Sequence, residues 1–417
     1  ADFNEAIRLN PSYVDAYRNR GIAYRSKGDA DRAIADYDQV LRLDPTDLGT
    51  YSARGTAYQY NKGDYQRALA DYDRATKLVP KPNDAIAYID RGIAYTGKRE
   101  YDRAIADFDE AIRIDPKLAE GYINRCHANL SKGDYDRAII DCDDAIRINP
   151  RHMDAYVDRG YSYYRKGDYD RALADYTQAI SLFPQNADAY RYRADSFYGK
   201  GDYLHAIADY TEALGLNPQD ARAYSSRASV YADQDDYDKA IADYQAALKL
   251  LPKNAGYLRS LGLVKFRKGD FQGSAADLLR SVEQKDDIYA MLFRYLARSR
   301  AGEPAGPELE ANIGRLSTRE WPYAVAELYL GKRAPEATMD AAANPDDRCE
   351  AQFYIGEWQL LNGHQAEAEA ALSVAVDTCQ KGYIEYKAAV AELARIRAAG
   401  PTATPADTHL QGTHVHK

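Results

Sequence analysis

The chain has 417 residues, with 64 acidic and 55 basic side chains and a formal net charge of −9. This length exceeds the size at which one compact core keeps growing, so several domains or an elongated repeat array are expected. Charges of both signs are interleaved without a long basic run, which argues against a nucleic-acid binder, and no apolar run approaches the roughly 18 residues of a membrane span.

The amino end reads ADFNEAIRLNP, without an initiating methionine and without a signal peptide. This stretch matches the second half of the repeat described next, so we expect the chain to start halfway through a structural unit. Its start therefore tells nothing about targeting.

One sequence theme recurs about every 34 residues. Segments such as RAIADYDQVLRLDP and RALADYTQAISLFP are copies of it, and the copies end at Pro45, Pro80, Pro116, Pro150, Pro184, Pro218 and Pro252. Apolar residues within a copy recur at spacings of three and four, which predicts two amphipathic helices per copy. The motif KGDY predicts the turn between them, because Gly allows the turn and Asp134, Asp168 or Asp202 can cap the next helix. Two copies are longer, by one residue in YQYNKGDY and by two in VPKPND, both in predicted turns.

The regular aromatic positions, the Gly-Asp-Tyr turn, the small residues and the terminal proline resemble the tetratricopeptide (TPR) repeat. The resemblance covers residues 1–288 and implies an all-α, right-handed superhelical solenoid of helix-turn-helix repeats, whose first repeat is truncated to its second helix. The chain has 37 tyrosines against 8 phenylalanines. Thirteen of the tyrosines open the helices of the repeats, where they are expected to pack between helices.

An arginine and an aspartate also recur once per repeat, the arginine at a position where the TPR pattern commonly has leucine. This regularity predicts a ladder of bidentate ion pairs. The alternative is an anion-binding stripe, but one aspartate per arginine would neutralise it. The predicted pairs are Arg20–Asp36, Arg54–Asp71, Arg91–Asp107, Arg125–Asp141, Arg159–Asp175, Arg193–Asp209 and Arg227–Asp243.

The TPR resemblance also implies a concave wall, built from the first helix of each repeat, that binds peptide segments or partner proteins. The apolar and tyrosine-rich centre of this wall suits such a ligand. Packing against neighbouring helices is the alternative role for the same side chains. No lysine-asparagine-arginine clamp for chaperone tails can be assembled. The predicted groove residues are Ile89, Ile93, Ile123, His127, Leu130, Val157, Tyr161, Tyr164, Arg191 and Tyr198.

The repeat decays after Pro252, and residues 289–398 are predicted to form a TPR-like helical region. Pro304, Pro307 and Pro322 mark the expected boundary or hinge. Residues 399–417, rich in Pro, Thr and Ala, are expected to be disordered.

The landmarks GDFQGSAADL, LFRYLARSR, ELYLGK, EAQFYIGEWQLLNG and EYKAAVAEL follow one another between Gly262 and Ile396. Their order resembles the carboxyl-terminal part of the bacterial new-lipoprotein-I (NlpI-like) family. The resemblance implies an adaptor in the periplasm or cell envelope that docks hydrolases and a processing protease, often as a homodimer. A cytosolic scaffold and a regulatory subunit that inhibits an enzyme are the alternatives.

No phosphate-binding loop, metalloprotease helix or nucleophile elbow occurs, so a non-enzymatic protein without a cofactor is expected. Histidines lie in separate repeats, except His409, His414 and His416 in the tail, which could bind metal adventitiously.

The four cysteines form two pairs in the sequence. Cys126 and Cys142 replace the small residue and the aromatic residue of the sister repeats, which face each other, and are either two buried thiols or a bonded pair. Cys349 and Cys379 fall at the two ends of a helical hairpin that lie side by side, so the geometry would allow a disulfide between them. Free thiols or a metal site are the alternatives there. A disulfide would place the protein in an oxidising compartment.

Overall fold

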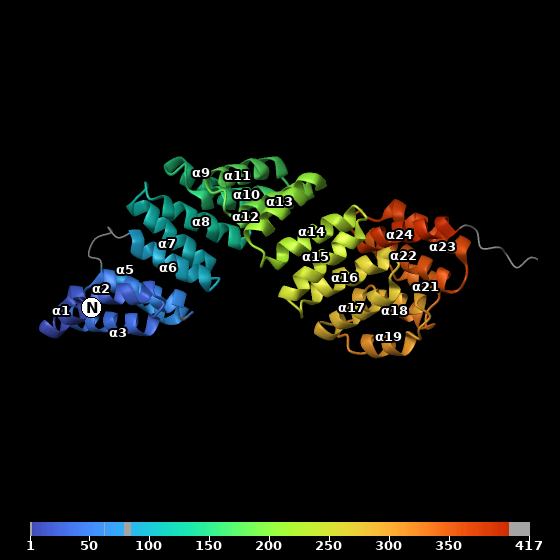
Figure 1. Ribbon diagram of the computed structural model, residues 1–417, viewed down its shortest axis with the longest axis horizontal. Coiled ribbons are helices and arrows are strands. Elements are labelled where there is room, and N and C mark those ends of the chain that lie inside the picture. Colours follow the sequence, from blue (N-terminus) through green and yellow to red (C-terminus); the bar gives the residue numbers. More distant parts are fainter. Residues whose placement is uncertain (1, 62, 79–84, 400–417) are drawn as a thin grey trace, which may run out of the picture. The chain divides into compact units, whose positions relative to one another are not determined.

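The computed structural model describes residues 2–61, 63–78 and 85–399. These residues form twenty-four α-helices and one π-helical turn, with no β-strand among them (Figure 1). The all-α fold is therefore as predicted. The chain divides into two compact units, Ala1–Leu216 and Asn217–Lys417.

The first unit is built from antiparallel helix pairs preceded by the single helix α1, which contacts α2. The pairs are α2/α3, α4/α5, α6/α7, α8/α9, α10/α11 and α12/α13. The helices are α1 (Asp2–Leu9), α2 (Val14–Ser26), α3 (Ala30–Leu43), α4 (Leu48–Thr56), α5 (Tyr65–Leu78), α6 (Ala85–Gly97), α7 (Tyr101–Ile114), α8 (Ala119–Lys132), α9 (Tyr135–Ile148), α10 (Met153–Arg165), α11 (Tyr169–Leu182), α12 (Ala187–Gly199) and α13 (Tyr203–Leu216).

The turns within the pairs follow the predicted chemistry. Gly133 and Gly167 adopt φ angles of +89° and +78°, which L side chains rarely adopt. The carboxylates of Asp134, Asp168 and Asp202 each accept the backbone N–H three residues on, at 3.2 Å. The three predicted caps are confirmed.

Glycine on the first helix lets an aromatic ring of the second helix pack against its backbone. A Cβ atom added at Gly160 would lie 3.0 Å from Cε1 of Tyr176, and one added at Gly92 would lie 2.5 Å from Cε1 of Phe108. Tyr176 and Phe108 are fully buried. This glycine–ring contact sets the spacing of the two helices in a repeat.

The extra residue of the second repeat lies in a helix and not in a turn. Helix α4 continues into a π-helical turn, Ala57–Asn61. A π-helical turn accommodates one more residue while the helix continues, so the next helix keeps its place. The two-residue addition in VPKPND lies outside the described residues.

The second unit contains two further pairs, α14/α15 and α16/α17, followed by shorter helices and the hairpin α22/α23. Its helices are α14 (Ala221–Asp233), α15 (Tyr237–Leu250), α16 (Ala255–Lys268), α17 (Phe271–Gln284), α18 (Ile288–Arg300), α19 (Gly306–Ile313), α20 (Tyr323–Tyr329), α21 (Pro335–Asp340), α22 (Pro345–Leu361), α23 (Gln365–Thr378) and α24 (Ile384–Ala399).

One hydrophobic core runs through most of this unit, from Phe266 to Ile396. It includes Leu309 and Ile313 of α19, which lie in the proline-rich segment expected to be a hinge. Helix α24 packs back on α16, where Nη1 of Arg395 donates a hydrogen bond to the carbonyl of Arg267 at 2.7 Å. The packing is therefore continuous across residue 288. The division at that residue marks where the repeat sequence decays, and as a domain boundary it stays a prediction.

Candidate protein-binding surface

The predicted ladder of arginine–aspartate pairs is present in all seven repeats, with donor–acceptor distances between 2.5 and 3.0 Å. In six repeats Nε and Nη2 of the arginine donate to different oxygens of the aspartate. In the repeat of α8 and α9, both Nε and Nη2 of Arg125 donate to Oδ1 of Asp141. The predicted pairing is confirmed, and the bidentate geometry holds in every repeat but this one.

Each ladder arginine has further contacts that tie it to its surroundings. The guanidinium of Arg159 lies 5.6 Å from the ring centroid of Tyr156, and its Nη1 donates to Asp143 on the preceding helix α9. Equivalent bonds join Arg54 to Asp38 and Arg91 to Asp73. With two carboxylates around most guanidinium groups, the ladder holds neighbouring helices together and leaves little positive charge for an anion.

Three partly buried tyrosines on α10 and α12 form a surface that we call the tyrosine cluster: Tyr161, Tyr164 and Tyr192. The ring of Tyr161 lies 6.3 Å from that of Tyr164 and 6.0 Å from that of Tyr192. Tyr192 in turn stacks at 5.8 Å on the buried ring of Tyr176. Burial raises the pKa of Tyr164 further above neutral pH, where tyrosine is already protonated. The ring contacts hold the three side chains in place, and the rings present neutral, amphipathic edges.

Charged groups flank the tyrosine cluster. The guanidinium of Arg191 lies 4.3 Å from the ring centroid of Tyr192 and is bonded to Asp188 at 2.7 Å. On α8, Nδ1 of the exposed His127 lies 3.4 Å from Oδ2 of Asp158 on α10. The bond to Asp158 raises the pKa of His127, and desolvation opposes that shift.

Three of the predicted groove residues are buried. Ile89 and Ile123 are 5% and 8% exposed and belong to the hydrophobic cores of their repeats, and Arg191, beside the tyrosine cluster, is 7% exposed. Ile93, Leu130 and Val157 are partly buried against these cores. Tyr198 contacts Tyr203, with their ring centroids 5.9 Å apart.

Burial of these side chains is the packing role that the sequence left open as the alternative, and the binding role of the predicted groove residues stays a prediction. The side chains are buried because first helices of successive repeats contact one another, as α6, α8, α10 and α12 do, and large aliphatic side chains fill the spaces between them. Sequence reasoning also missed Asp158 as a partner of His127. The two residues are 31 positions apart, close to one repeat period, and this spacing could have indicated that they face each other on neighbouring first helices.

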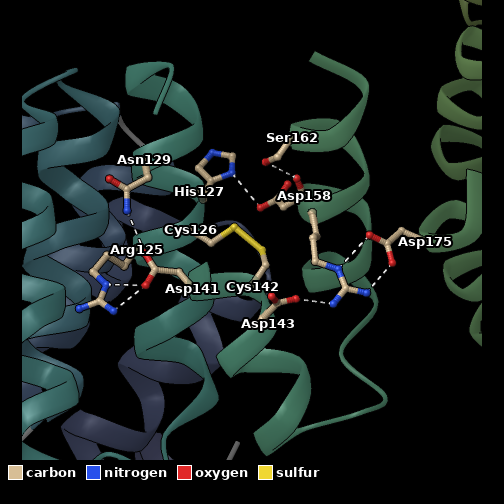
Figure 2. The surroundings of a disulfide bond; sticks show 11 residues. Arg125, Cys126, His127, Asn129, Asp141, Cys142, Asp143, Asp158, Ser162 and Asp175 are labelled. Atoms are coloured by element: carbon tan, nitrogen blue, oxygen red, sulfur yellow. Dashed lines mark hydrogen bonds and ion pairs between the residues drawn. A yellow bond between two sulfur atoms is a disulfide. The ribbon is translucent and has the colours of Figure 1, made fainter. Parts of the chain in front are cut away.

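Both pairs of cysteines are joined by disulfides. Cys126–Cys142 links α8 to α9, with the two Cα atoms 5.6 Å apart and the Arg125–Asp141 pair beside it (Figure 2). Cys349–Cys379 links the beginning of α22 to the end of α23, with a Cα–Cα distance of 5.1 Å. Within the described ranges, no group of three or more metal-binding side chains gathers in one place. His409, His414 and His416 lie outside those ranges.

No helix in the described part of the chain combines the length and the apolar character that a membrane span requires.

Comparison with known families agrees with this architecture. Models of the tetratricopeptide repeat match residues 14–47, 56–119, 119–152, 157–221 and 221–254, which together are more than half of the chain. The chain belongs to the tetratricopeptide repeat proteins. The matches end before the region that resembles NlpI-like adaptors, so that resemblance stays a prediction.

One solved structure shows the same fold, and two further structures are similar to parts of the chain. The APC/C hetero-tetramer Cut9-Hcn1 aligns with a TM-score of 0.50 at 19% identity, covering 71% of this chain and 58% of that one. A tetratricopeptide repeat protein from Parabacteroides merdae aligns at 0.49 and 21% identity, covering 60% of this chain and 98% of that one. MamA aligns with a TM-score of 0.36 at 29% identity, covering 40% of this chain and 96% of that one.

Proposed function

We propose that this chain is a protein-interaction scaffold whose first unit binds a peptide segment of a partner at the tyrosine cluster. The observation that carries the proposal is that the ring of Tyr161 contacts the rings of both Tyr164 and Tyr192. The three side chains lie on two neighbouring first helices, α10 and α12, and are partly exposed. Tyrosine and arginine are enriched among residues that dominate binding energy, because they offer a large rigid area at low entropic cost. Contacts among the rings and the stacking of Tyr192 on the buried Tyr176 hold them in place, so little reorganisation is needed on binding.

The tyrosine cluster favours a peptide with an apolar or aromatic anchor. Asp188 and Asp195 lie 2.7 Å and 3.8 Å from the guanidinium of Arg191, and Asp158 faces His127. Nη1 of Arg165 also donates to the hydroxyl of Tyr161 at 3.1 Å, so the carboxylates around the cluster are matched by cations. The rings themselves therefore offer the main contact area for a partner's side chain.

Photo-crosslinking tests the location of the site. A benzophenone amino acid placed at Tyr164 should crosslink to one reproducible peptide of a partner, identified by mass spectrometry. The same group placed at Tyr13, a tyrosine 46% exposed on another part of the unit, serves as control. Equal crosslinking from Tyr164 and from Tyr13 would contradict the proposal.

We further propose that the protein works in an oxidising compartment such as the periplasm or cell envelope, as an adaptor that recruits hydrolases or proteases. The support is that both cysteine pairs are bonded, which is typical of such compartments, and that Gly262–Ile396 resembles envelope adaptors. Maleimide labelling of the denatured protein from its native source, before and after reduction, tests the compartment. Four free thiols before reduction would favour a cytosolic scaffold or an inhibitory subunit.

A further inference from the structure

Besides its disulfide, the repeat of α8 and α9 departs from its sisters at two further positions that lie close together. It has Asn129 where the others have an aromatic residue, and Ile140 where the others have alanine. The sister aromatics are Tyr24, Tyr58, Tyr95, Tyr163, Phe197 and Tyr231, and the sister alanines are Ala35, Ala70, Ala106, Ala174, Ala208 and Ala242.

In the sister repeats the aromatic ring packs beneath a basic side chain of the second helix. The guanidinium of Arg171 lies 4.3 Å from the ring centroid of Tyr163, and that of Arg32 lies 4.6 Å from Tyr24. Tyr163 is only 9% exposed and lies in a core against which Ile139 of the preceding second helix packs. The ring is therefore enclosed by a cation and an aliphatic side chain.

The repeat of α8 and α9 has the same enclosure without the ring. Arg137 is the counterpart of Arg171, and Ile105 of α7 is the counterpart of Ile139. Both line a pocket of about 220 Å³, together with Asp109, Arg125, Asn129, Ile140 and Asp141. The pocket thus occurs where sister repeats hold an aromatic side chain, and Ile140 adds apolar surface to its wall.

Asn129 gives this pocket an unused hydrogen-bond acceptor. The residue is 2% exposed, and its Nδ2 donates to Oδ2 of Asp141 at 2.8 Å (Figure 2). A carboxylate only accepts, which fixes the orientation of the amide. Oδ1 of Asn129 then has no hydrogen-bond partner among the described residues. A buried acceptor without a donor is unfavourable, so a ligand that donates to it gains affinity.

We propose that this pocket binds the phenol ring of a tyrosine side chain presented by a partner protein. The ring lies between Ile105 and Ile140 beneath the guanidinium of Arg137, and its hydroxyl donates to Oδ1 of Asn129. Neutral phenol fits better than an anionic aromatic group, because Asp109 and Asp141 line the pocket and Arg125 is already bonded to both. The site is lined by α7, α8 and α9 and shares no residue with the tyrosine cluster, so it is independent of the peptide site proposed above.

The test uses the full chain and three capped amino acids followed by ligand-detected NMR: N-acetyltyrosinamide, N-acetylphenylalaninamide, and N-acetylcyclohexylalaninamide, which has neither a π face nor a hydroxyl. We expect the tyrosine probe to bind most tightly. Asn129→Tyr supplies the sister side chain and should weaken binding at least tenfold, and Arg137→Ala should weaken it by about two- to fivefold through loss of the cation–π contact.

A gain-of-site variant keeps the proposal falsifiable if Asn129→Tyr does not fold. Tyr163→Asn combined with Ala174→Ile copies the pocket into the next repeat, and we expect it to bind a second equivalent of the tyrosine probe. No detectable binding to the wild type, equal binding to a folded Asn129→Tyr variant, or equal affinity for the cyclohexyl probe would each show that the pocket holds only solvent.

Discussion

Arg159 on α10 donates two parallel hydrogen bonds to Asp175 on α11, from Nε to Oδ2 at 2.9 Å and from Nη2 to Oδ1 at 2.5 Å. Its remaining Nη1 donates to Asp143 on α9, in the preceding repeat, at 2.5 Å. One guanidinium therefore joins three helices of two repeats. Because this arrangement recurs, the ladder couples the repeats to one another as well as the helices within each repeat.

The two carboxylates around Arg159 should contribute very differently to stability. The side chain of Asp175 is 7% exposed and that of Asp143 is 52% exposed. Asp175→Ala leaves the arginine without its buried partner and should cost about 3 kcal/mol, whereas Asp143→Ala should cost less than about 1 kcal/mol. Urea unfolding followed by circular dichroism measures both. Similar small losses for the two variants would mean that the ladder is not a stabilising element.

The Cys126–Cys142 disulfide occupies the place of the glycine–ring contact in the sister repeats. Replacing both cysteines by alanine should cost about 3 kcal/mol, the value expected for a closed loop of this length. The matched control, Cys126→Gly with Cys142→Tyr, restores the pair seen at Gly160 and Tyr176 and should recover much of that loss. Thermal unfolding under non-reducing conditions compares the three proteins. A control no more stable than the alanine variant would contradict the equivalence of the two arrangements.

The buried Glu385 should make the stability of the second unit depend on pH. It is 2% exposed and accepts a hydrogen bond from the hydroxyl of Tyr354 at 2.8 Å. Burial raises the pKa of Glu385 to about 7, against about 4.3 for an unfolded glutamate. The folded state then holds a proton that the unfolded state has lost, so stability falls as pH rises from about 5 to about 7, by on the order of 3 kcal/mol.

Urea midpoints measured at several pH values test this. Glu385→Gln keeps the shape but cannot ionise, so it should make the midpoint less dependent on pH in that range. Burial also raises the pKa of Glu357, in the same unit, to about 8. The Glu385→Gln variant should therefore keep the part of the pH dependence of stability that comes from Glu357. An unchanged slope in Glu385→Gln would show that Glu385 does not titrate in this way.

His127 should titrate above the ordinary histidine value of about 6.5. The cause is its bond to Asp158, so Asp158→Asn should return the pKa toward that value. The contribution of this bond to stability is fully present below the unfolded pKa and disappears as pH rises through the folded one. The ring chemical shifts of His127, followed by NMR as a function of pH, measure the pKa in both proteins. Identical His127 titrations in both proteins would contradict the pairing.

Much of the fold could be predicted from the sequence, because its determinants recur with the repeat. The pairing of Arg159 with Asp175 was visible as two charges repeating in step, and the turn at Gly167 and Asp168 as a local motif. Burial of Ile89 and Ile123 was not visible, because it depends on how closely neighbouring first helices approach. The pocket at Asn129 required a comparison of what surrounds a position in successive repeats, which residue types alone do not give.

The most direct measurement of the central claim is the affinity of a crosslinked partner peptide, once identified, for the wild-type chain and for Tyr161→Ala with Tyr164→Ala. Fluorescence anisotropy with the labelled synthetic peptide gives the Kd, and Tyr13→Ala is the matched control. The proposal predicts a loss of at least tenfold for the double variant, since each truncated hot-spot residue costs about 1–2 kcal/mol, and no change for the control. Equal affinities for all three proteins would show that the tyrosine cluster is not the binding site.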